Sequence, residues 1–343
     1  MDPREFARDR LAFHGLLTTP PITSELLAGN AAGDPHLREL PVYLPPGWEA
    51  PGSELPVVFV LAGFTGRGQN YLETHPWKRG VVAVFDRAVA AGECPPAILV
   101  LPDCFTRLGG SQYVNSSFLG PYEDHVVHEL TAFVDEHFPT LPGRRGVVGK
   151  SSGGFGAMHL SMRHPERFPV AASISGDCHF EMSYAGSFPA ALRGLLAHDS
   201  DPARFLESFA ADPSLAGDAH ALIDLLAMSA CYSPNPDAPL GFDLPIELET
   251  GGRIPEVWER WLAFDPLHAC VPRADSWRRL EFLHLECGLR DEFNLQFALR
   301  VLTRRLRDLA IPHAHEEFDA GHFGIDDRYQ FLLPRMIEVL AGS

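Results

Sequence analysis

The feature that most constrains this chain is a Gly-x-Ser-x-Gly pentapeptide at residues 149–153, which reads Gly-Lys-Ser-Ser-Gly. A short β-branched stretch precedes it and a helix-compatible stretch follows it, which is the strand–turn–helix context of a nucleophile elbow. A serine at the tip of so tight a turn adopts strained backbone angles, and small neighbours let the strand and helix approach each other. The pattern predicts Ser151 as a nucleophile, with Gly149 and Gly153 lacking bulk on either side. The competing interpretation is a chance Gly-Ser-Gly loop in a chain with 30 glycines.

The overall composition is that of a water-soluble globule. The 343 residues are 45% hydrophobic, enough for one large α/β domain with insertions or for two smaller domains. The net charge of −17 opposes binding to nucleic acid or to an anionic membrane surface, so neither is expected as a partner. The one dense basic stretch, residues 300–307, alternates with apolar residues at helical spacing and predicts a solvated helix face.

Targeting and cofactor signals are weak throughout the sequence. The charged residues 1–10 contain no apolar signal-peptide core, and no apolar run approaches the roughly 18 residues of a membrane span, so we expect a cytoplasmic protein. The six cysteines include no Cys-x-x-Cys pair, which predicts neither a zinc site nor a disulfide framework. We expect no metal and no cofactor, and the composition does not predict the oligomeric state.

Strand-like and helix-like segments alternate along much of the chain. This alternation predicts an α/β fold with a mainly parallel central sheet and helices on both faces. Continuous apolar runs at 57–61 and 98–101 are typical of central strands that are buried on both sides. The predicted strands are 40–44, 56–62, 97–101, 146–149, 170–174, 280–285 and 314–318, and the predicted helices among them include 79–91, 122–138 and 153–163.

The alternation lapses in the middle of the chain. We predict an N-terminal extension over 1–36, an α/β core over 37–176 and 276–343, and a mostly helical lid insertion over 177–275. Residues 245–249 inside the insertion are expected to form one further strand. Aromatic and large apolar residues of the insertion are candidates for a pocket wall, although most are expected to pack its own core: Phe180, Met182, Tyr184, Phe188, Trp258, Trp261 and Phe264.

A serine nucleophile needs a base and a group that orients the base. In the chain order serine, acid, histidine, the acid candidate is Asp291, which follows a predicted strand and a short glycine loop. Asp291 is also suited to capping the helix that follows, and Glu292 is the reserve acid. The base candidate is His322, which lies between two glycines in the loop after strand 314–318. For His313 and His315, which alternate along that strand, an edge-strand position is favoured over a metal site.

The oxyanion of acyl transfer needs two preorganised N–H donors. We expect one from Ser152, directly after the nucleophile, and one from Phe64 in the loop after strand 56–62. The glycines of that loop, Gly63 to Gly68, would alternatively cradle a phosphate. The loop lacks the full glycine pattern and the lysine of phosphate-binding loops, which weakens this alternative.

These segments together resemble the esterase D family of α/β-hydrolases, which includes feruloyl and acetylxylan esterases, siderophore esterases, S-formylglutathione hydrolases and mycolyltransferases. The likeness covers roughly residues 37–176 and 280–340 and leaves out the insertion. The matching motifs are Tyr43-Leu44-Pro45-Pro46-Gly47-Trp48, Leu101-Pro102-Asp103, Tyr113-Val114-Asn115-Ser116, Tyr122-Glu123-Asp124, the elbow itself and Arg163-His164-Pro165-Glu166-Arg167-Phe168.

The chain departs from the family pattern beside the nucleophile. Lys150 stands where the family often has His or Gln, and Ser152 where it often has Met or Phe. The family's Leu-His-Gly motif is Leu-Ala-Gly here, with Ala62 in place of the histidine. Backbone donors survive such changes, so the resemblance implies that the chemistry persists while the choice of substrate differs. Candidate pocket residues are Lys150, Asp103, Asn115 and Trp258, and scaffold roles are favoured for Asp103, Asn115 and Asp124.

The sequence thus predicts a serine hydrolase that cleaves small carboxylic esters through an acyl-enzyme at Ser151. Three alternatives stay open: an acyltransferase, a thioesterase on the same fold, and a catalytically silent binding protein. The acyl and alcohol groups of the substrate cannot be derived from the fold.

Overall fold

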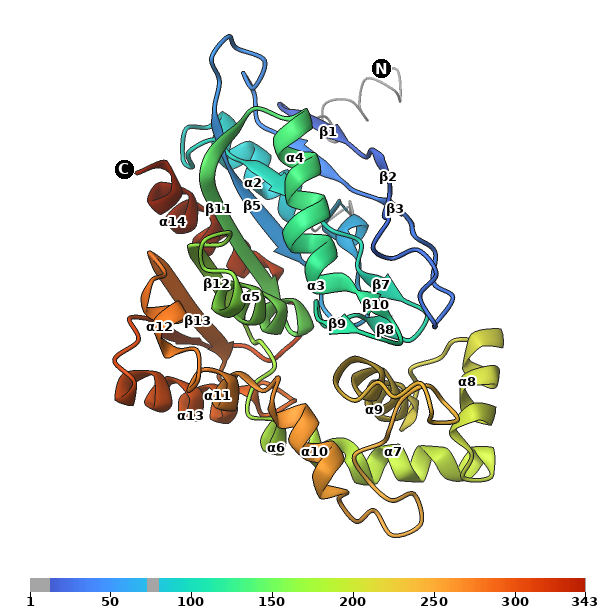
Figure 1. Ribbon diagram of the computed structural model, residues 1–343. Coiled ribbons are helices and arrows are strands. Elements are labelled where there is room, and N and C mark those ends of the chain that lie inside the picture. Colours follow the sequence, from blue (N-terminus) through green and yellow to red (C-terminus); the bar gives the residue numbers. More distant parts are fainter. Residues whose placement is uncertain (1–12, 73–79, 343) are drawn as a thin grey trace, which may run out of the picture.

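The computed structural model describes residues 13–72 and 80–342, which form an eight-stranded sheet in the order β1-β4-β6-β5-β11-β12-β13-β14 (Figure 1). The six strands β6, β5, β11, β12, β13 and β14 run parallel to one another, and β4 is antiparallel to both β1 and β6. The expected α/β fold with a mainly parallel sheet is therefore confirmed. Its strands are β1 Leu16–Thr18, β4 Val42–Leu44, β5 Leu55–Leu61, β6 Ile98–Val100, β11 Thr140–Lys150, β12 Val170–Ile174, β13 Phe282–Gly288 and β14 Ala314–Phe318.

Part of the N-terminal segment belongs to this sheet. Strand β1 lies within the predicted extension and adds an edge strand beside β4. In the described part of the chain, three small antiparallel ribbons lie outside the main sheet: β2 Pro21–Thr23 with β3 Leu37–Glu39, β7 Phe105–Thr106 with β8 Gly109–Gly110, and β9 Asn115–Ser116 with β10 Gly120–Pro121. The start of the extension, residues 1–12, lies outside the described residues.

The central strand β5 shows why the sequence of a central strand is a continuous run of apolar residues. Val57, Phe59 and Leu61 pack into the core on one face, and Val58 and Val60 pack into the core on the other. All five side chains are fully buried. Because parallel strands are covered by helices on both faces, neither face of β5 needs polar residues.

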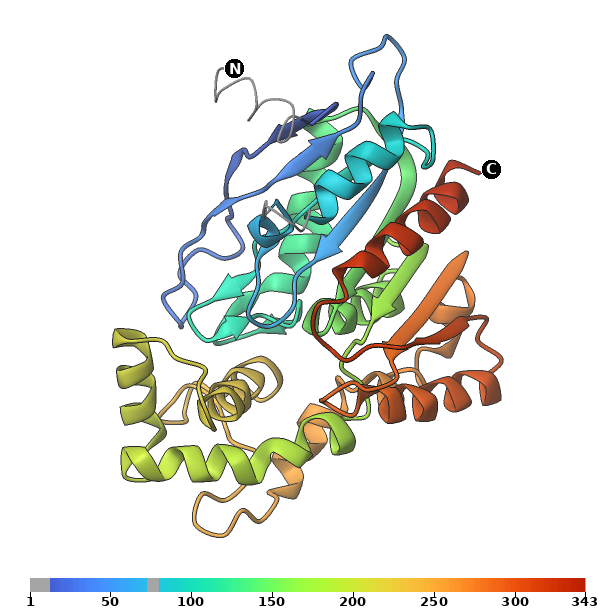
Figure 2. The same ribbon diagram turned by 180° about the vertical axis from the view of Figure 1, so that it is seen from behind.

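Helices cover both faces of the sheet (Figures 1 and 2). Helices α2 and α14 pack on one face, and the helices from α3 to α5 together with α13 pack on the other. Their bounds are α2 Val81–Ala90, α3 Tyr122–Asp124, the π-helical turn η2 His125–Leu130, α4 Thr131–His137, α5 Ser152–Arg163, α13 Leu295–Asp308 and α14 Tyr329–Ala341, with short 3-10 turns η1 Gly68–Leu72 and η5 Asp326–Arg328. No helix in residues 13–72 or 80–342 is long and apolar enough to cross a membrane.

Between β12 and β13 the chain forms a helical insertion, residues 175–281, which Figure 2 shows beyond one end of the sheet. The expected strand at 245–249 is wrong, because Ile246 makes only an isolated bridge to Arg253 across a turn. The insertion's own core is aromatic, with Tyr232 and Trp261 buried in ring contact at 5.4 Å. Its helices are α6 Phe180–Ser183, η3 Ala185–Ser187, α7 Phe188–Leu195, η4 Leu196–His198, α8 Pro202–Ala211, α9 Ala219–Tyr232, α10 Pro255–Leu262, α11 Pro266–Ala269 and α12 Ala274–Arg278.

Candidate active site

Ser151 lies at the tip of a strained turn between β11 and α5. Its backbone angles are φ 58° and ψ −128°, a combination that side chains rarely adopt. A Cβ on Gly153 would lie 2.0 Å from the Leu61 carbonyl oxygen, and a Cβ on Gly149 would lie 2.3 Å from the Gly153 carbonyl group. Only glycine fits at these two positions, which is the steric requirement that the pentapeptide predicted.

His322 and Asp291 lie beside this serine in a chain of hydrogen bonds. The His322 Nε2 atom is 3.0 Å from the Ser151 hydroxyl oxygen, and His322 Nδ1 is 2.7 Å from Asp291 Oδ2. His322 lies in the loop after β14 and Asp291 in the loop after β13, and both are buried. Since β11, β13 and β14 are parallel, their carboxyl ends bring the three side chains to one edge of the sheet.

Asp291 and Glu292 are adjacent in the chain, but their carboxylates contact different parts of His322. Asp291 Oδ1 accepts a hydrogen bond from the Phe293 backbone N–H at 2.9 Å, so it holds the following turn as well as the imidazole. Glu292 Oε2 accepts from the backbone N–H of His322 at 2.6 Å and, within the described structure, makes no hydrogen bond to a ring nitrogen of His322. The geometry therefore brings Asp291, rather than the reserve acid Glu292, to the histidine ring.

The two expected oxyanion donors lie on the segments that flank Ser151. Ser152 is the first residue of α5, where the helix leaves its N–H without an intrahelical acceptor. Phe64 follows Gly63, whose Cβ position would lie 3.5 Å from the Ser151 Cβ. Within the described residues no backbone acceptor is recorded for the N–H of Phe64 or Ser152. The loop after β5 and the start of α5 thus both present N–H groups beside Ser151.

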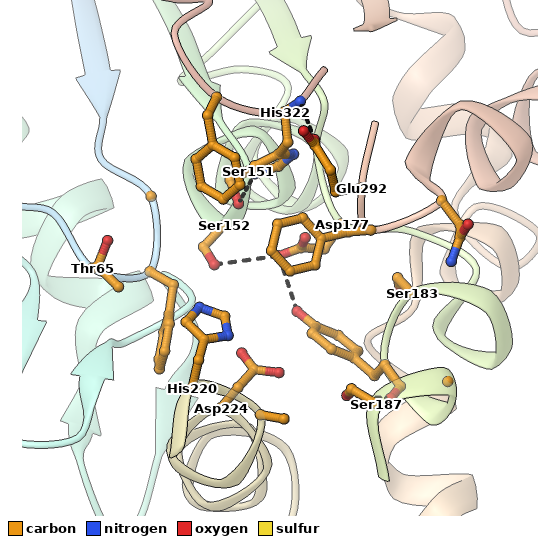
Figure 3. A pocket seen from close by; sticks show the side chains of 18 of the residues that line it. Thr65, Ser151, Ser152, Asp177, Ser183, Ser187, His220, Asp224, Glu292 and His322 are labelled. Carbon is orange, nitrogen blue, oxygen red and sulfur yellow. Dashed lines mark hydrogen bonds between the residues drawn. The ribbon is translucent and has the colours of Figure 1, made fainter. Parts of the chain in front are cut away.

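A cavity of about 440 Å³ opens in front of Ser151 and His322 (Figure 3). Its walls come from the β5 loop, the elbow, the loops after β12, β13 and β14, and the insertion elements α6, η3 and α9. Of the seven aromatic and apolar candidates for a pocket wall, Met182 and Tyr184 line it. The exposed ring of Phe323 and the partly buried ring of Phe293 lie beside the imidazole of His322.

Two carboxyl groups with raised pKa values line this cavity. Burial raises the pKa of Asp177 to about 6, although the nearby His322 and hydrogen bonds from the Tyr184 and Ser152 hydroxyls oppose the rise. Burial, and then the charge of Asp177, raises the pKa of Asp224 to about 8. The sequence reasoning missed both. Asp177 follows β12 at the same sheet edge as Ser151, which was a usable signal, whereas Asp224 on α9 had none.

The predicted pocket residues separate into two groups. Lys150 lines the cavity, and its Nζ lies 3.7 Å from an oxygen of Asp326. The other three do not line it: Asp103 accepts from the Phe105 N–H in the β7 ribbon, Asn115 accepts from the Asp124 N–H, and the Trp258 indole donates to Glu181. They are scaffold groups because each already has a partner within its own local structure.

One cluster in the described ranges has the residue types of a metal site. Single ligand atoms of His284, Glu286 and Glu316 lie within 4.8 Å of one another. The Arg328 guanidinium, however, donates to both Oε atoms of Glu286 at 2.9 Å and to Glu316 at 3.1 Å. Arg335 also pairs with Glu316, so two cations already hold the two carboxylates, and the cluster is an ion-pair network rather than a cation site.

Serine, acid and histidine follow parallel strands in the chain order that α/β-hydrolases use. The mainly parallel sheet and the strained elbow place this protein in that structural class.

The chain belongs to the family described as "Putative esterase", which matches residues 35–337 and so runs through the insertion as well. Among solved structures, a ferulic acid esterase is similar with 20% identity and a TM-score of 0.61, over 95% of this chain and 99% of that chain. An S-formylglutathione hydrolase from Agrobacterium tumefaciens shares 18% identity with a TM-score of 0.52, over 96% and 95% of the two chains. A fluorophosphonate-binding serine hydrolase of Staphylococcus aureus shares 15% identity with a TM-score of 0.54, over 96% and 98%. The resemblance to the esterase D family is thereby confirmed.

Proposed function

We propose that this protein is a serine hydrolase that cleaves carboxylic esters through an acyl-enzyme at Ser151. The observation that carries the proposal is the hydrogen-bond chain from the Ser151 hydroxyl through His322 to Asp291. A serine hydroxyl becomes a nucleophile only when an oriented base takes its proton, and this chain provides both the base and its orientation. Membership of an esterase family supports small ester substrates.

In the first half-reaction, Ser151 Oγ attacks the ester carbonyl carbon and His322 Nε2 takes the hydroxyl proton. Asp291 stabilises the imidazolium through Nδ1, and the N–H groups of Phe64 and Ser152 receive the negative oxygen. The C–O bond to the alcohol then breaks, and the alcohol leaves with the proton from His322. Water then attacks the carbonyl of the acyl-enzyme while His322 takes its proton. The bond to Ser151 Oγ breaks, His322 returns the proton to that oxygen, and the acid is released.

The helical insertion would act as the lid that the sequence analysis predicted. The support is its contribution of Tyr184, Ser187 and Asp224 to the cavity in front of the serine. A wall built from a segment outside the sheet can vary without disturbing the turn that carries the nucleophile. The insertion is therefore the region that would set the choice of substrate.

The test is hydrolysis of p-nitrophenyl esters from acetate to decanoate, and of methyl ferulate, by wild type and Ser151→Ala. We expect the substitution to abolish turnover and labelling by a fluorophosphonate while the fold and the melting temperature stay unchanged. Ser208→Ala removes an exposed serine of α8 and is the matched control. Retained turnover in Ser151→Ala would refute the mechanism.

The same assay separates the remaining alternatives. Absence of both turnover and labelling in wild type would support the silent binding protein. Labelling without hydrolysis of any ester would favour acyl transfer, which product analysis with added alcohols and amines would then detect. Faster cleavage of a thioester than of its oxygen ester would identify a thioesterase.

A further inference from the structure

The cavity in front of Ser151 is lined by more acidic groups than the chemistry of ester cleavage requires. Among the described residues, three carboxyl groups line it, those of Asp177, Asp224 and Glu292, against one ammonium group, that of Lys150. That ammonium already lies 3.7 Å from Asp326. Glu292 is engaged by the backbone N–H of His322. Asp177 and Asp224 therefore remain as acids without a cation beside them in the described structure.

Asp177 is held firmly but only through one oxygen. The hydroxyls of Tyr184 and Ser152 donate to its Oδ2 at 3.0 and 3.3 Å, and no hydrogen bond to Oδ1 is recorded in the described ranges. The residue is 8% exposed, and it lines the cavity beside Ser151. Because Asp177 lines the cavity, a ligand there can supply this oxygen with a donor or a positive charge.

Asp224 adds a second carboxyl group from the insertion. Helix α9 carries it one turn after His220, and both side chains point toward the cavity (Figure 3). No hydrogen bond or ion pair of Asp224 is recorded among the described residues. Burial, and then the neighbouring His322, lowers the pKa of His220, so this imidazole is neutral and offers Asp224 no charge.

The apolar part of the cavity also suits a cation. The rings of Phe64, Tyr184 and Phe293 line the same space, and aromatic faces attract ammonium groups. Anionic ligands would be repelled by the carboxylates. The pKa of about 8 leaves Asp224 protonated at neutral pH in the empty cavity. A neutral polyol could hydrogen-bond to the acids, but only a cation would favour their charged forms.

Resting on the proposed hydrolase function, we propose that the cavity selects esters that carry a positively charged nitrogen, held by Asp177 and Asp224 and facing the aromatic rings. The charge sits on the acyl or the alcohol side of the ester, away from the carbonyl that Ser151 attacks. No further bond is made or broken, because the acids bind and orient the substrate while the triad performs the cleavage.

The experiment compares esters that differ only in a charge. Butyrylcholine is paired with 3,3-dimethylbutyl butyrate, in which carbon replaces the nitrogen on the alcohol side. Ethyl 4-(trimethylammonio)butyrate is paired with ethyl 5,5-dimethylhexanoate for the acyl side. For at least one pair we expect wild type to prefer the cation by roughly tenfold in kcat/KM, the factor that about 1.4 kcal/mol of charge interaction produces.

Variants assign the preference to the two acids. Asp224→Asn and Asp177→Asn should each reduce the ratio of cationic to neutral kcat/KM toward one. The ratio within one variant is unaffected by the fraction of protein that folds. Glu207→Gln removes a charge from the exposed face of α8 in the same insertion and should keep the wild-type ratio.

The results that would overturn the cation preference differ from those that would overturn the hydrolase function. Equal rates on both pairs, a preference for the neutral esters, or a preference that survives both substitutions would overturn the proposal. A preference for a polyol ester over both cations would also overturn it. In all these results Ser151-dependent hydrolysis of neutral esters would leave the proposed function standing, whereas absence of Ser151-dependent hydrolysis of every ester would overturn the function itself.

Discussion

The sheet edge and the helical insertion form two walls of one cavity, but they are built in different ways. On the sheet side, Ser151, Asp291 and His322 each follow a parallel strand, so strand order alone brings them together. On the insertion side, Tyr184 and Asp224 reach the cavity only because helices pack around an aromatic core. The comparison teaches that the proposed catalytic groups depend on local turns, whereas the proposed substrate-binding groups depend on how a separate segment packs.

The largest expected effect tests the sheet side. Asp291→Asn should lower kcat by about 10⁴-fold, because the amide no longer stabilises the imidazolium and favours the wrong tautomer of His322. Glu292→Gln keeps an oxygen that accepts the His322 backbone N–H and should change kcat by less than about tenfold. Steady-state kinetics on p-nitrophenyl acetate measures both. Similar losses of kcat in the two variants would contradict the assignment of Asp291, rather than Glu292, as the acid that orients His322.

A smaller effect, on the free energy of unfolding, distinguishes Gly153 in the elbow from Gly186 in the insertion. In Gly153→Ala the new Cβ would meet the Leu61 carbonyl oxygen at 2.0 Å, so we expect the free energy of unfolding to fall by about 3 kcal/mol. Gly186 in the insertion also borders the cavity, but no atom lies within 4 Å of its Cβ position. Gly186→Ala should therefore change the free energy of unfolding by less than about 0.5 kcal/mol. Urea denaturation followed by circular dichroism tests the pair, and a tolerant Gly153 would contradict the close strand–helix contact.

The smallest effect concerns the pH dependence of stability at the insertion wall. The pKa of Asp224 is raised from 3.8 to about 8, so the folded chain binds this proton more tightly than the unfolded chain. Its contribution to the free energy of unfolding is therefore greatest below about pH 4, falls as the pH rises and levels off above about pH 8. The groups whose charges act on it or respond to it are Asp177, Tyr184, Cys231 and Tyr232, and His220 lines the same cavity.

Asp224→Asn removes this titration. Relative to wild type, the variant should gain about 1 kcal/mol or more in free energy of unfolding between pH 5 and pH 8. Urea denaturation at the two pH values measures the gain, with Glu207→Gln as the control that should show none. A variant that loses stability relative to wild type as the pH rises would reverse the sign and exclude an Asp224 that is protonated in the folded chain.

Most of the sheet could be predicted from local patterns. Strand β14 was predicted with its observed bounds, and continuous apolar runs indicated β5 and β6 because both faces of these strands are buried. The expected strand at 245–249 failed because its alternating apolar residues pack within a turn of the insertion. Periodicity reports that a side chain is buried, but it does not report which element buries it.

By itself the sequence determined the elbow, the order of its partners and the family resemblance. These depend on short-range sterics at Gly149 and Gly153 and on the direction of parallel strands, both of which are written in neighbouring residues. Only the tertiary structure decided that Asp291 rather than Glu292 reaches His322, that Trp258 packs inside the insertion, and that Asp177 and Asp224 line one cavity. The physical reason is that these outcomes depend on how elements far apart in the chain pack together, which no local pattern specifies.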